Sequence, residues 1–99
     1  MARVLRTHRA QLDLEEILDD LDAKSPKAAE RLADEVDARC RALANFPEMG
    51  RARGEIWPDL RSTVVRHYVL FYRLAGDDVE VLRILHGRRD TERIMKDER

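Results

Sequence analysis

Seven basic side chains in the second half of the chain are the residues best suited to chemistry or to charged contacts. They are Arg61, Arg66, Arg73, Arg83, His86, Arg88 and Arg89. Cutting an RNA backbone needs groups that activate the 2′-hydroxyl, stabilise the extra phosphate charge and protonate the leaving oxygen. Arginines supply cations, and a histidine supplies an imidazole that titrates near neutral pH. If the chain cleaves RNA, the candidate catalytic residues are Arg73, Arg83 and His86.

The same arginines are also typical of a solvated sheet surface with salt bridges to nearby carboxylates. Arg61, Arg73 and Arg83 fall on separate neighbouring predicted strands, so we expect them to gather on one face that meets an acidic partner. His86, at a strand end, is expected to be a hydrogen-bonded structural residue, because no tyrosine or carboxylate lies near it in the sequence to form an acid–base pair.

Other reactive constellations are missing from the sequence. Five acids share the polar side of a predicted helix: Glu15, Glu16, Asp19, Asp20 and Asp22. They neither converge nor alternate with histidine, so no metal site is expected. There is no nucleophile–histidine triad and no glycine-rich phosphate loop, so no cofactor is expected. Cys40 stands alone inside a helical pattern and is predicted to be a core thiol.

Two large apolar side chains stand apart from the predicted core pattern. Leu12 lies nearly opposite the apolar stripe of its helix and is expected to point to solvent or to another chain. Trp57 precedes a proline in a loop, where a tryptophan often covers the core. Both also fit a partner surface, on which large apolar side chains dominate binding. The two interpretations stay open for each residue.

Composition indicates an ordinary globular domain, with 43% apolar and 39% charged residues in 99. A single domain over residues 1–99 is expected. The formal net charge of −1 divides into −3 for residues 1–50 and +2 for residues 51–99. This asymmetry is too mild for direct sequence-specific binding of nucleic acid. Without an apolar run of about 20 residues or a leader-like start, the chain is expected in the cytoplasm and off the membrane.

Helical periodicity predicts two helices in the first half of the chain. Thr7 is expected to cap the first helix, which starts near His8 and sets apolar side chains opposite the acids. Ser25 followed by Pro26 predicts the start of the second helix, because proline is well tolerated at a first helical position. The pattern ends before Pro47. Because so short a break separates the helices, we expect an antiparallel hairpin whose apolar face a sheet must cover.

Strand-like runs fill the rest of the chain, apart from one loop. The predicted strands are residues 3–6, Leu60–Arg66, Tyr68–Leu74 and Val79–Leu85. Residues 46–58 show neither period and predict a loop. Asp90 or Thr91 is expected to cap a final helix that reaches about Met95. The expected fold is α+β: an N-terminal strand, an antiparallel helical hairpin packed on a mostly antiparallel four-stranded sheet, and a short C-terminal helix.

The order of these elements and several short motifs closely resemble the RelE/ParE toxin superfamily over nearly the whole chain. The motifs are Pro47-x-x-Gly50, Leu60-Arg61, Tyr68-x-x-Phe71-Tyr72-Arg73 and Ile84-Leu85-His86-Gly87-Arg88-Arg89-Asp90. The His-Gly-Arg-Arg-Asp ending resembles the ParE branch more than the RelE branch. The resemblance implies a ParD-like antitoxin encoded beside the toxin and a hetero-oligomeric complex of the two.

The resemblance also implies one of two activities. ParE proteins inhibit DNA gyrase and leave broken DNA, whereas RelE proteins cut messenger RNA inside the ribosome, with basic residues and often a C-terminal tyrosine. No tyrosine follows Tyr72 here, and the second helix carries only Lys24 and Lys27 near its start in place of several RelE lysines. We therefore expect a non-enzymatic gyrase inhibitor, with RNA cleavage and a non-toxic binding partner as alternatives. Its interfaces are expected to use Leu12, Trp57 and the seven basic residues.

Overall fold

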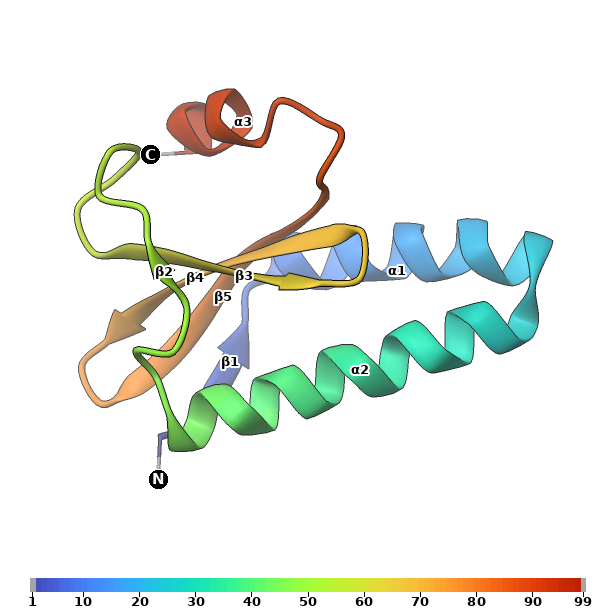
Figure 1. Cartoon of the computed structure of the whole chain (residues 1–99), viewed down its shortest axis with the longest axis horizontal. Coiled ribbons are helices and arrows are strands. Elements are labelled where there is room, and N and C mark those ends of the chain that lie inside the picture. Colours follow the sequence, from blue (N-terminus) through green and yellow to red (C-terminus); the bar gives the residue numbers. More distant parts are fainter. Residues whose placement is uncertain (1, 99) are drawn as a thin grey trace.

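The computed structural model describes residues 2–98, which alternate between helices and a single sheet (Figure 1). The elements along the chain are β1 (Val4–Arg6), α1 (His8–Lys24), α2 (Pro26–Asn45), β2 (Arg51–Ala52), β3 (Leu60–Val65), β4 (Tyr68–Ala75), β5 (Asp78–His86) and α3 (Thr91–Glu98). The expected α+β architecture and the positions of its main elements are confirmed.

The two long helices begin at the residues that the capping signals predict. Thr7 Oγ1 accepts a hydrogen bond from the Ala10 N–H at 3.1 Å, which satisfies one of the free donors at the start of α1. Ser25 Oγ accepts from the Ala28 N–H at 3.3 Å, and Pro26 opens α2. Because only Ser25 separates the helices, they run antiparallel as the hairpin seen in Figure 1.

The sheet has the strand order β1-β5-β4-β3-β2. β1 is parallel to β5, and the other neighbours are antiparallel. β4 is the central strand, and its adjacent side chains Phe71 and Tyr72 are both fully buried although they point to opposite faces. The apolar character of this strand at both parities is therefore explained by a cover on each face.

The sheet has one strand more than the four expected. Arg51 pairs with Ser62 and Ala52 with Arg61, which makes β2 a two-residue edge strand inside the predicted loop. Two residues are too few to show the alternation of a strand, so the sequence pattern could not predict β2. A tertiary contact holds the preceding turn instead. The buried Tyr72 hydroxyl accepts from the Gly50 N–H at 2.9 Å and donates to the Pro47 carbonyl at 2.8 Å.

Two apolar cores lie on the two faces of the sheet. The larger core joins the sheet to the helical hairpin and includes Cys40, which confirms the prediction of a core thiol. The smaller core groups Ile56, Leu60, Phe71, Leu85 and Met95 on the other face. In Figure 1, α3 lies above the sheet and α2 below it. The C-terminal helix is thus part of the packed structure, and its Met95 is fully buried.

Gly50 occupies a position with no room for a side chain. A Cβ there would lie 2.6 Å from Tyr72 Oη and 2.8 Å from the carbonyl oxygen of Ser62. The Ser62 carbonyl belongs to the backbone of β3 and cannot move aside alone. We expect Gly50→Ala to lower the free energy of unfolding by about 1–3 kcal/mol through overpacking, as measured by urea denaturation followed by circular dichroism.

The matched control for this prediction is Gly54→Ala in the same loop. A Cβ at Gly54 meets nothing within 4 Å, and surface changes of this kind usually stay within about 0.5 kcal/mol. Equal unfolding free energies for the two variants would contradict the close approach between the turn and β3.

Candidate partner-binding surfaces

The predicted cluster of arginines on one face of the sheet is wrong. Arg61 lies directly opposite Tyr72 in the ladder, so the two side chains share a face. Arg73 follows Tyr72 and therefore projects from the other face. Arg83 lies opposite Phe71 and shares the face of Arg73. The three strands are neighbours, as expected, but their register separates Arg61 from the other two arginines.

The arginines on β3 and β4 make structural contacts within the molecule. Arg61 Nη1 donates to the carbonyls of Glu48 and Gly50 at 3.1 and 2.7 Å and so fastens the turn after α2. Arg73 pairs with Glu80 across β4 and β5 at 3.1 Å. Such half-exposed pairs contribute little to stability. The Arg73 side chain is 48% exposed and remains accessible to a partner. The Arg61 side chain is instead held against the turn by its hydrogen bonds.

Arg66 sits in the tight turn between β3 and β4 with a φ of 55°. Its guanidinium forms two hydrogen bonds to Glu35 of α2, at 2.5 and 2.9 Å. The pairing lowers the pKa of the Glu35 carboxyl. The side chains of Arg66 and Glu35 are 43% and 39% exposed, so an acidic partner can reach this pair too.

Arg83 is buried, which corrects its assignment to a binding surface or a cleavage site. Its side chain is 4% exposed and donates to both carboxylate oxygens of Asp13, at 2.7 and 3.0 Å; Asp13 is 5% exposed. A third contact joins Arg83 to Glu98 of α3. Hydrogen bonding to Asp13 raises the pKa of Arg83 above its ordinary value. The guanidinium thus ties α1, β5 and α3 together inside the molecule.

Asp13 is the partner of Arg83 that the sequence analysis missed. It also accepts the backbone N–H of Ile84 at 3.0 Å. β1 pairs only with residues 79–81 of β5. The edge of β5 beyond these residues is covered by the start of α1. There the Thr7 hydroxyl, just before α1, donates to the Leu82 carbonyl at 3.2 Å. The available signal was helical spacing, because Asp13 stands three residues after Ala10 and inside the apolar stripe.

An irregularity in β5 accompanies this contact. Tyr72 lies opposite Val81 and Phe71 lies opposite Arg83, so Leu82 is an extra residue in β5. Bulges bend a strand and re-aim its side chains. The bulge puts Arg83 where its side chain can meet both α1 and α3, and no sequence pattern indicated it.

His86 lines a groove of about 490 Å³ between α1 and the ends of β4 and β5. Its ring meets the edge of Tyr68 at 5.2 Å between centroids and lies 6.4 Å from that of His67, at 11° to it. His86 Nδ1 accepts the Arg88 N–H at 3.0 Å, which confirms a hydrogen-bonded histidine. Burial, and after it the charge of Asp20, raises the pKa of the Tyr68 hydroxyl.

The rest of this groove has mixed charge. Arg89 reaches it from the turn after β5, while Arg88 beside it is exposed and does not line it. Lys24 adds a second cation, and the carboxylates of Glu16 and Asp20 line the same space. A phosphate would be attracted by the cations and repelled by the carboxylates, so the groove is a poor site for an RNA backbone.

The two unassigned apolar residues differ in their surroundings. Trp57 is half-buried against the smaller core, and its indole N–H donates to the Met95 carbonyl at 2.7 Å. This geometry is that of a lid that fastens α3. Leu12 is half-buried and packs against neither core cluster among the residues described. Leu12 thus keeps part of its apolar surface accessible.

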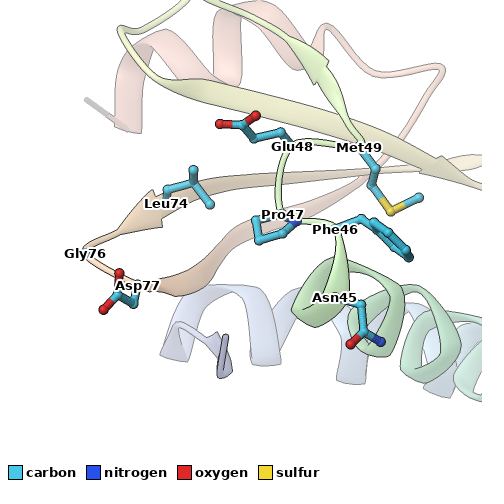
Figure 2. Close-up of a pocket in the computed structure, with 8 residues that line it drawn as sticks. All are labelled: Asn45, Phe46, Pro47, Glu48, Met49, Leu74, Gly76 and Asp77. Atoms are coloured by element: carbon cyan, nitrogen blue, oxygen red, sulfur yellow. The ribbon is translucent and has the colours of Figure 1, made fainter. Parts of the chain in front are cut away.

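A further hollow, which the sequence analysis did not identify, opens where α2 ends (Figure 2). Its volume is about 680 Å³, and it is lined by Asn45, Phe46, Pro47, Glu48, Met49, Leu74, Gly76 and Asp77. Its side chains come from the turn after α2 and from the β4–β5 hairpin. In Figure 2, Leu74 and Glu48 lie on one side of Pro47, and Phe46 and Met49 on the other. It combines large apolar side chains with two carboxylates.

The described part of the chain has neither a candidate metal centre nor a candidate membrane helix. Between residues 2 and 98 there is no group of three or more His, Cys, Asp or Glu placed to hold a metal ion. No helix in that range has both the length and the apolar character needed to cross a membrane.

Comparison with known proteins gives consistent matches. The family model described as "ParE toxin of type II toxin-antitoxin system, parDE" matches residues 4–91. The chain is 36% identical over 89 residues to "Toxin ParE3" of Caulobacter vibrioides, covering 89% of each. It is 38% identical to "Toxin RelE2" of that organism, covering 90% of this chain and 99% of the relative. A solved chain of the "Chromosomal ParDE TA system from P. aeruginosa" matches with a TM-score of 0.74 at 21% identity, covering 87% of this chain and 96% of that one.

Proposed function

This chain belongs to the family of ParE toxins of type II toxin–antitoxin systems, and we propose that it acts without catalysis, by binding and inhibiting DNA gyrase. It is the toxin component of such a system. The observation that favours binding over RNA cleavage is the burial of Arg83 against Asp13. A cation held in that way is not available to a scissile phosphate.

The proposed neutralising partner is a ParD-like antitoxin in a hetero-oligomeric complex. The solved relative is described as a ParDE system. Arg73, Arg88 and Arg89 are exposed and can meet an acidic antitoxin segment. Leu12 and the outer part of Trp57 offer apolar contacts at such an interface. Because gyrase works on the chromosome, the proposed site of action is the cytoplasm.

A plasmid supercoiling assay tests this function. Purified gyrase, ATP and relaxed plasmid are mixed with increasing amounts of folded, antitoxin-free protein. We expect loss of supercoiling or accumulation of linear plasmid at micromolar toxin. Adding the antitoxin encoded by the gene beside the toxin gene should reverse this inhibition. Normal supercoiling at micromolar excess of a folded protein would rule out gyrase as the target.

RNA cleavage is the second candidate, and one observation favours it. His67, Tyr68 and His86 meet in a groove that Arg89 also lines, and these groups could transfer protons during cleavage. The carboxylates of Glu16 and Asp20 in the same groove count against this candidate, because they repel a phosphate. A relative at 38% identity carries the name RelE2. This activity predicts cuts in translated messages on ribosomes that disappear with His86→Ala. Intact messages beside inhibited gyrase would leave binding as the function.

A further inference from the structure

The exposed apolar surface of the molecule is concentrated in the hollow at the end of α2. Phe46 is 68% exposed, Met49 47% and Leu74 36%. The other large apolar residues with comparable exposure among those described, Leu5 and Val64, do not line the hollow. An apolar cluster rimmed by polar residues is the usual form of a protein-binding site.

The charged side chains that line the hollow are all negative. Glu48 and Asp77 line it, and no lysine or arginine is among its lining residues. α2 points its C-terminal end at the hollow and has no basic residue in its last turn, so the negative end of its dipole is not offset there. The lining charges and the end of α2 therefore favour a cation in the hollow.

Two side chains of the sheet form hydrogen bonds with the turn that carries Phe46 and Met49 and hold it in place. The Tyr72 hydroxyl holds the Pro47 carbonyl at 2.8 Å and the Gly50 N–H at 2.9 Å. Arg61 Nη1 donates to the carbonyls of Glu48 and Gly50. A surface ordered before binding loses less conformational entropy when a partner docks.

We propose that this hollow is the anchor site for the gyrase target, taking a segment that places a large apolar side chain beside an arginine or lysine. The inference rests on the proposed function and names the surface that carries it out. The occupant is chosen by charge complementarity. Glu48, Asp77 and the end of α2 attract a cationic side chain, whereas an acidic segment would be repelled there and attracted to the exposed arginines.

The test compares gyrase inhibition by matched surface variants. The double variant Phe46→Ala, Met49→Ala is expected to need at least about tenfold more protein for half-inhibition of supercoiling, because anchor residues carry most of the binding energy. Glu48→Lys with Asp77→Lys should weaken inhibition as well, most strongly at low salt. The control is Val64→Ala, which removes an exposed apolar side chain outside the hollow and should inhibit like the wild type.

Each variant is checked for wild-type circular dichroism and thermal midpoint, and for affinity to the antitoxin encoded beside the chain. The proposal is supported if the wild type inhibits gyrase, both hollow variants inhibit it more weakly, and their affinity for the antitoxin is unchanged. Equal inhibition by the wild type and the hollow variants would overturn it while leaving the proposed function standing. Loss of antitoxin affinity with unchanged gyrase inhibition would overturn the proposal and assign the hollow to the antitoxin. An inactive wild type would overturn both the proposal and the gyrase function.

Discussion

Asp13→Ala is expected to lower the free energy of unfolding by about 3–5 kcal/mol, because it leaves the buried guanidinium of Arg83 without its main partner. The variant also removes the acceptor of the Ile84 N–H. Glu98 reaches the same guanidinium from α3 but is partly exposed, so it compensates incompletely. Small domains have about 5–15 kcal/mol of stability, so this loss should be plain in urea denaturation.

Two companion variants identify the cause. Asp13→Leu combined with Arg83→Met removes both charges and should regain part of the loss, since apolar replacements of a buried pair are often neutral. The recovery should be incomplete, because the Ile84 N–H still lacks an acceptor. Glu35→Ala breaks the exposed pair with Arg66 and should cost below about 1 kcal/mol. If Asp13→Ala cost no more than Glu35→Ala, the Asp13–Arg83 pair would be solvated in solution.

Trp57→Ala is expected to lower the free energy of unfolding by about 3 kcal/mol and to release α3 from the sheet. The indole packs on the smaller core and is half-buried, so the loss should fall at the lower end for a buried tryptophan. Its N–H also holds the Met95 carbonyl at 2.7 Å. Hydrogen exchange of the amides in residues 91–98, together with urea denaturation, measures both effects.

Trp57→Phe is the matched control for the released helix. Phenylalanine keeps an apolar ring on the core but cannot donate to Met95, so about 1 kcal/mol should be lost. Exchange rates in α3 should then rise less than in Trp57→Ala. Unchanged stability and exchange in Trp57→Ala would contradict the role of lid and leave Trp57 with its proposed partner contact alone.

Local sequence signals were sufficient for most of the secondary structure. Thr7, Ser25 and Pro26 mark where α1 and α2 begin, because caps and proline act through contacts within one turn. The apolar run at residues 68–74 predicted the central strand, since burial on both faces leaves no polar parity. The motifs at residues 68–73 and 84–90 indicated the family, which the match over residues 4–91 supports. The short strand β2 was not predicted, because it depends on contacts with β3 and Tyr72.

The candidate sites were decided by the tertiary structure. Arg83 and Asp13 are 70 residues apart, and their pairing depends on the bulge in β5 and on where α1 crosses the sheet edge. The face of each arginine depends on strand register, since a one-residue shift moves a side chain to the other face. The hollow joins the end of α2 to the β4–β5 hairpin. The sequence by itself determined the elements and the family, because periodicity and capping are local, whereas burial and site geometry arise only when distant segments meet.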